Sequence, residues 1–170
     1  MRAIALIIVA AVLALPAWSQ EMPKPGPEHK MLKELEGTWT TSLKAGGKEA
    51  KGTATYKMEL GGFWLTGTMQ SDMFGTKFTG KSLESYHPAK KKYVSVWVDS
   101  MSTAPVNMEG TYDKEKKTMT MAGEGPGMDG KMTKYKSVSK FPDANTIEMT
   151  MWIGDGKEPT FSVTYKRKKK

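Results

Sequence analysis

The chain has 170 residues, a formal net charge of +8 and no cysteine. The lack of cysteine excludes disulfides, thiol-based redox chemistry and zinc sites built on cysteine. The length suits a single domain that is large enough to bury a core without disulfide support.

The first segment of the chain has the features of a signal peptide. Arg2 supplies a positive start, residues 3–15 form an apolar run, and Ala17-Trp18-Ser19 fits a small-x-small cleavage site. The run is shorter than the ~20 residues of a membrane span. The sequence therefore predicts a signal peptide at residues 1–19, cleavage before Gln20, a secreted or periplasmic location, and no membrane-spanning segment.

A proline-rich linker at residues 20–30 follows, and it overlaps a short helical segment. Between Glu28 and Glu36, apolar side chains recur at helical spacing, and Gly37 ends the pattern. Residues 31–167 form the predicted domain, and residues 168–170 form a basic tail. We interpret the basic tail and the lysine run at residues 90–92 as solvated; contact with a polyanion or an anionic lipid is the alternative.

Ten strand-like runs fill the predicted domain, and each ends in turn-forming residues such as Gly61-Gly62 or Gly154-Asp155-Gly156. Short strands without intervening helices predict an all-β fold, a single antiparallel up-and-down β-barrel of about ten strands with a short N-terminal helical turn. The expected strands are 38–44, 51–60, 63–71, 77–86, 93–99, 106–112, 118–122, 131–140, 146–153 and 160–166.

The alternation of side chains predicts which face of each strand lines the barrel. Threonines alternate with apolar residues, as expected for a wall with one buried face. The strand 93–99 is ambiguous, because its valines share one face while Trp97 and Asp99 share the other. We predict that Trp97 and Asp99 point inward. The other expected inner-face residues include Ala54, Tyr56, Met58, Leu60, Met119, Met121, Ile147, Met149, Met151, Ile153, Phe161, Val163 and Tyr165.

Two stretches carry a family resemblance. Residues 27–39 read Pro-Glu-His-Lys-x-Leu-x-x-Leu-x-Gly-x-Trp, and Ser85-Tyr86-His87-Pro88 precedes Tyr93-x-x-x-Trp97-x-Asp99-Ser100. Together they resemble the exported bacterial family known as domain of unknown function 1579. The resemblance implies a lipocalin-like, calycin-type barrel in which Trp39 closes the base and Arg167 packs across it. It brings no established activity, and it marks His87 as a turn residue, because this position is more usually Asp in that family.

Candidate catalytic and metal-binding patterns are few. His29 and His87 lack the context of a haem ligand and are interpreted as surface or capping residues. A Gly-x-Ser-x-Gly nucleophile motif is absent. Glu84 and Asp99 lie on adjacent expected strands and would make a catalytic pair only if they converged.

The methionines are unusually numerous, with 14 in the chain. The pairs Met119-x-Met121 and Met149-x-Met151 place two thioethers on one face of a strand, which could suit Cu(I). We favour a role in lining an irregular apolar interior, because methionine adapts its shape. An adaptable ligand surface is the third alternative. The sequence thus predicts no metal site and no cofactor.

The sequence therefore predicts a non-enzymatic binder of a small apolar or amphipathic ligand, with no nucleic-acid partner. A structural or envelope-associated barrel without ligand is the first alternative, and an enzyme of unknown reaction is the second. The expected ligand-binding residues are Tyr56, Met58, Trp64, Trp97, Asp99, Met119, Met121, Met149 and Met151.

Overall fold

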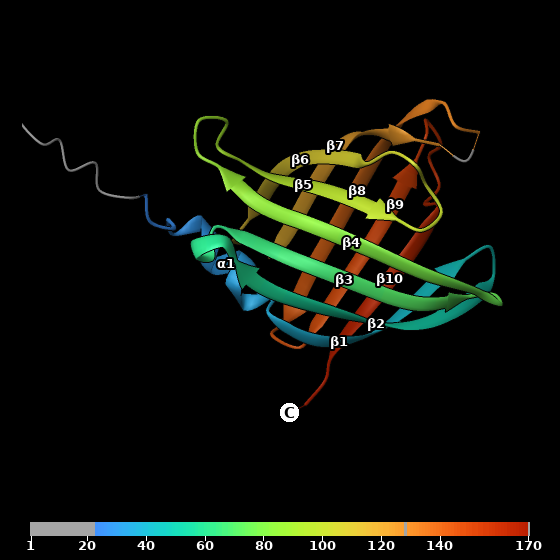
Figure 1. Cartoon of the computed structure of the whole chain (residues 1–170), viewed down its shortest axis with the longest axis horizontal. Coiled ribbons are helices and arrows are strands. Elements are labelled where there is room, and N and C mark those ends of the chain that lie inside the picture. The colour runs from blue at the N-terminus through green and yellow to red at the C-terminus, as the bar shows by residue number, and fades with distance from the viewer. Residues whose placement is uncertain (1–22, 128, 170) are drawn as a thin grey trace, which may run out of the picture.

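The computed structural model describes residues 23–127 and 129–169, and it shows one helix followed by a closed barrel of ten strands (Figure 1). The expected signal peptide and the cleavage site before Gln20 lie outside the described residues. Helix α1 spans Glu28–Glu34. The strands are β1 (Gly37–Ala45), β2 (Lys48–Glu59), β3 (Trp64–Met73), β4 (Thr76–His87), β5 (Lys92–Asp99), β6 (Val106–Asp113), β7 (Thr118–Pro126), β8 (Met132–Asp143), β9 (Thr146–Ile153) and β10 (Phe161–Arg167).

Each strand pairs antiparallel with its neighbours in the chain, and β1 pairs with β10 to close the barrel. The closing pair runs from Trp39 opposite Arg167 to Lys44 opposite Ser162. Closure leaves no unpaired sheet edge. The predicted fold class, a ten-stranded antiparallel up-and-down barrel, is confirmed. In the described part of the chain, no helix has the length and apolar character needed to cross a membrane.

Most strand boundaries differ from the expectation by one to three residues, and the end of β7 differs by four. Strand β7 continues to Pro126 because Gly123 and Gly125 are ladder residues pressed against β6. A Cβ on Gly123 would lie 1.9 Å from the Asn107 carbonyl oxygen, so the close approach requires glycine. Leu60, expected on the inner face, instead lies in the 3₁₀ turn η1 (Leu60–Gly62) and is 69% exposed.

Helix α1 lies across one end of the barrel (Figure 1). Its Leu32 side chain is buried in a cluster with Leu65, Tyr93 and two methionines of β7. The Tyr93 hydroxyl donates a hydrogen bond of 3.1 Å to the Glu28 carbonyl, which ties the helix to β5. These contacts fix α1 as the closure of one end, which we term the base.

The base is held together by Trp39 and Arg167. Trp39 is 1% exposed, its indole N–H donates to the Leu35 carbonyl at 3.0 Å, and the Arg167 guanidinium lies 4.1 Å from its ring centre. Arg167 also donates to the carbonyls of Glu34, Glu36 and Ala144. The predicted cation–π closure is confirmed.

Candidate functional site: the barrel lumen

The inner face of the barrel follows from strand alternation and register. On β4, Ser82 is buried and Glu84 is half-buried, whereas Leu83 between them is 43% exposed. Glu84 pairs with Ser95 of β5, and Ser95 pairs with Met108 of β6. Paired residues share one face of a sheet, so these side chains face the lumen.

Eight of the nine expected ligand-binding residues occupy inner-face positions in this alternation. They are Tyr56, Met58, Trp97, Asp99, Met119, Met121, Met149 and Met151. On β5, Tyr93 is buried while Val98 is 45% exposed, which places Trp97 and Asp99 on the inner side.

Trp64 is a correction to the sequence-based assignment. Its neighbour Leu65 is fully buried in the base cluster, so Trp64 points to the opposite, outer face of β3. An aromatic residue is common on either face of a strand, and the sequence of β3 alone did not settle its phase.

The middle of the inner face carries side chains that are only partly buried. Glu84, Ser95 and Met108 stand side by side on β4, β5 and β6, and each keeps part of its surface accessible although it faces inward. Tyr56 and Trp97, also inward-facing, are likewise only partly buried.

An aromatic group lines the wall away from the base. The Trp97 and Phe78 rings stack with centres 6.3 Å apart and an angle of 21° between their planes. The Trp97 ring covers Gly80, where a Cβ would lie 2.2 Å from the ring. Its indole N–H donates to an Asp99 carboxylate oxygen at 2.8 Å, and the Met101 N–H donates to the other oxygen at 2.8 Å. Asp99 therefore holds the Trp97 ring flat against β4.

A polar group lies deeper, around Glu84. Burial raises the pKa of Glu84 to about 7, while a hydrogen bond from Ser82 opposes the rise. Burial also raises the pKa of Tyr165 to about 12, and the Tyr56 pKa is raised well above its usual value by burial, then by Tyr165 and Glu84. Glu84, Tyr56 and Tyr165 are thus close enough to influence one another across the lumen.

Gly67 makes this grouping possible. It lies between Tyr56 and Ser82 in the ladder, and a Cβ there would come within 2.3 Å of the Ser82 hydroxyl and 2.8 Å of the Tyr56 ring. Any larger residue on β3 would push the tyrosine and the serine apart. From the sequence, Glu84 was expected only as a catalytic candidate. Phe78, Ser82 and Glu84 are an even number of residues apart on one strand, and this spacing indicated that they share its inner face and place polar side chains there.

The two lumen carboxylates do not form a catalytic pair. Asp99 pairs with Gly80, four residues along β4 from Glu84. At the rise of a strand this offset corresponds to about 13 Å. That separation is too long for two carboxylates to act on one bond, since even inverting glycosidases place theirs at roughly 6.5–9.5 Å.

The lumen contains carboxylates but no matching cation. Within the described strands, lysine or arginine occupies inner-phase positions only at the two barrel ends, Lys48 and Arg167. Lys48 lies over the Phe74 ring and Arg167 over Trp39. All ion pairs found in the described residues are on the outside, and none involves Glu84 or Asp99.

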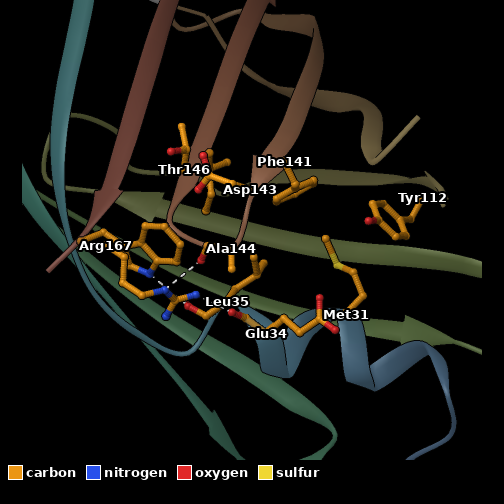
Figure 2. A pocket seen from close by; sticks show the side chains of 11 residues that line it. Met31, Glu34, Leu35, Tyr112, Phe141, Asp143, Ala144, Thr146 and Arg167 are labelled. Atoms are coloured by element: carbon orange, nitrogen blue, oxygen red, sulfur yellow. Dashed lines mark hydrogen bonds between the residues drawn. The ribbon is translucent and has the colours of Figure 1, made fainter. Parts of the chain in front are cut away.

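Two hollows lie outside this space. A small cavity of about 50 Å³ at the base is lined by Met31, Leu35, Trp39 and neighbouring side chains (Figure 2). An open depression of about 480 Å³ lies over β7 to β9, where Lys136 covers the Trp152 ring at 5.4 Å. The base cavity is closed in by Arg167, and the depression faces solvent.

The histidines are placed differently from each other. His29 is buried, not at the surface as expected, and its ring packs edge-on against Phe63 and Tyr86. Its Nδ1 accepts a hydrogen bond from the Gly26 N–H at 3.1 Å. His87 is an exposed residue at the end of β4 and accepts from the Lys90 N–H at 3.4 Å, as a turn residue does.

Among the described residues, no three histidine, aspartate or glutamate side chains gather as metal ligands would. The methionine pairs face the apolar interior, where Met119 and Met121 pack in the base cluster. The absence of a metal or cofactor stays a prediction.

Comparison with known proteins gives a family. No curated protein matches the sequence significantly. Among solved structures, a redesigned β-barrel is similar at 14% identity with a TM-score of 0.48, covering 82% of this chain and 96% of the other. A de novo designed fluorescence-activating β-barrel is similar at 14% identity and a TM-score of 0.48, covering 81% and 96%. The family described as "Protein of unknown function (DUF1579)" matches residues 24–167, nearly the whole described chain, and this chain therefore belongs to the DUF1579 family.

Proposed function

We propose that this protein is a non-enzymatic binder that holds a small apolar or amphipathic molecule in the barrel lumen. The observation that carries the proposal is the partly accessible inner surface at Glu84, Ser95, Met108 and Trp97. A lumen that is mostly apolar with a few placed polar groups is the usual composition of a small-molecule site.

The lining supports modest selectivity. Methionine side chains of β6, β7 and β9 can repack around ligands of different shape. Trp97 offers a large flat surface whose orientation is fixed by Asp99. We further propose that the protein acts after export, on the basis of the signal-like residues 1–19.

The proposal is tested by titration with an environment-sensitive apolar dye. We expect a dissociation constant in the micromolar range, about −8 kcal/mol. The Trp97→Ala variant should bind the dye more weakly, because the substitution removes the largest inner aromatic surface near Phe78.

Trp64→Ala is the matched control. It removes the same side chain from the outer face of the barrel, so dye affinity should be unchanged. Equal loss in both variants, or no dye binding to the folded wild-type protein, would contradict a lumen site and favour a structural barrel.

A further inference from the structure

The inner face holds the carboxyl groups of Glu84 and Asp99 without a lysine or arginine to pair with them, and this bears on which ligands the lumen accepts. Glu84 faces inward in the middle of β4, and its neighbours in register are Leu65 and Ser95. No lysine or arginine of the described strands faces the same space away from the barrel ends. A buried carboxylate without a partner is costly.

Several features around Glu84 point to a ligand rather than to a purely structural carboxylate. Glu84 is only partly buried although it faces inward. Ser82 lies on the same strand and hydrogen-bonds to it, and the Tyr56 ring and the Ser82 hydroxyl approach each other over Gly67. The charge of Glu84 also raises the pKa values of Tyr56 and Tyr165, from β2 and β10. Tyr86 and Tyr93, with ring centres 5.2 Å apart, stand at the next inner positions towards the base.

We propose that Glu84 is the recognition group for a cationic amphiphile, a molecule with one protonated amine on an apolar body. This inference rests on the proposed lumen-binding function and names its ligand class. The ammonium group would form a charge-assisted hydrogen bond with the Glu84 carboxylate, and nearby aromatic faces would stabilise it further. The apolar body would extend along the methionine and Trp97 surfaces.

The electrostatic environment of Glu84 is consistent with this ligand class. Its raised pKa of about 7 reflects burial without a compensating charge. A bound ammonium would favour the ionised carboxylate and lower that pKa again. The positive exterior repels a cation during approach, but physiological salt screens charges beyond about 8 Å.

The test compares three ligands that share one alkyl chain: decylammonium, decanol and decanoate. Binding is measured by isothermal titration calorimetry on the chain that begins at Gln20. We expect wild-type protein to bind decylammonium at least tenfold more tightly than decanol, and decanoate most weakly. In Glu84→Gln the preference for decylammonium over decanol should disappear while decanol affinity is kept.

Asp99→Asn is the matched control, because it removes the same charge from the other lumen carboxylate. Asp99 accepts hydrogen bonds from Trp97 and Met101, so this variant should bind both alkyl ligands more weakly through the loosened Trp97 ring but keep the ratio of decylammonium to decanol affinity. Loss of the preference in Asp99→Asn but not in Glu84→Gln would overturn the assignment to Glu84.

A second readout uses wild-type protein alone and therefore survives misfolding of a variant. The decylammonium-to-decanol affinity ratio should rise between about pH 5.5 and about pH 8.5 as Glu84 ionises, while the alkylamine stays protonated. The titratable and charged groups on the inner side are Tyr56, Tyr86, Tyr93, Tyr112, Tyr135, Tyr165 and Asp99, with Lys48 and Arg167 at the barrel ends and His29 of α1 against Tyr86.

Equal affinity for all three ligands, or a preference for decanoate, would overturn the cation inference and leave lumen binding intact. Failure of all three ligands and of the neutral dye to bind would overturn both proposals.

Discussion

Trp39 joins the helix, the first strand and the last strand at the base of the barrel. Its indole N–H reaches the carbonyl of Leu35, and Arg167 covers its ring while hydrogen bonding to three backbone carbonyls. Gly37 has a φ of 127°, and a Cβ at this position would lie 2.9 Å from the Arg167 guanidinium. The spacing Gly-x-Trp is thus required by the packing of Arg167.

Replacing Trp39 by alanine should cost about 3–5 kcal/mol of unfolding free energy, as for other buried aromatic truncations. Urea unfolding of the variant measures this loss. Trp64→Ala, on the outer face, should lose much less. Similar stability of Trp39→Ala and wild type would contradict the closure of the base by this residue.

Glu84 should make stability depend on pH. Its pKa is about 7 in the folded protein, against an ordinary value of 4.5, so the folded state binds the proton more tightly than the unfolded state. The contribution of Glu84 to stability is therefore fully present below about pH 4.5 and is lost as pH rises through about 7, a loss of about 3 kcal/mol.

Glu84→Gln cannot ionise and should lack this loss. The variant should therefore be more stable than wild type at pH 8 and nearly equal to it at pH 4.5, as measured by chemical unfolding at each pH. Wild-type and variant curves that run parallel across this range would show that Glu84 is not a buried, uncompensated acid.

At the scale of single strands, β4 carries the main features of the site. Its inner positions hold an aromatic residue, two small residues and a carboxyl group in one line: Phe78, Gly80, Ser82 and Glu84. Gly80 leaves the surface on which the Trp97 ring lies. The two ends of this strand therefore differ, with an aromatic surface near Gly80 and a polar group near Glu84.

Gly80→Ala should displace the Trp97 ring, because the new Cβ would lie 2.2 Å from it. Overpacking of this kind typically costs about 1–3 kcal/mol. We expect lower stability and weaker dye binding, together with a change in tryptophan fluorescence. Gly156→Ala is the control, since no atom lies within 4 Å of its would-be Cβ. If Gly80→Ala binds the dye with unchanged affinity, Trp97 is not part of the binding surface.

The sequence was sufficient to predict the strands and most of the inner face. The alternation of threonine and methionine in β7 and β9 correctly assigned their inner and outer residues. In a barrel wall with one buried and one solvent-exposed face, apolar and polar side chains alternate at every second position. The end of β7 was missed because Gly123 and Gly125 look like loop residues unless the close approach of β6 is known. Trp64 was assigned to the wrong face because β3 lacks clear alternation.

The polar group of the site was harder to predict. Tyr56 and Tyr165 are far apart in sequence and come together only when β1 pairs with β10 and closes the barrel. The sequence also did not reveal that the missing side chain of Gly67 leaves the space in which the Tyr56 ring and the Ser82 hydroxyl approach each other. Such groupings depend on shear and register, which a strand pattern does not specify.

At the scale of the whole molecule, the first expectation is that the protein is exported. If residues 1–19 are a signal peptide, the protein in its host begins at Gln20. N-terminal sequencing of protein isolated from its host should find this start. Retention of Met1 would contradict export through this segment.

The central claim is that the closed barrel encloses space for an apolar ligand. The most direct measurement is a crystal structure of the protein grown with an apolar dye at saturating concentration. We expect the dye inside the lumen, in contact with Trp97 and the Glu84 side of β4. Dye bound only in the outer depression at Trp152, with the lumen filled by protein side chains, would contradict it.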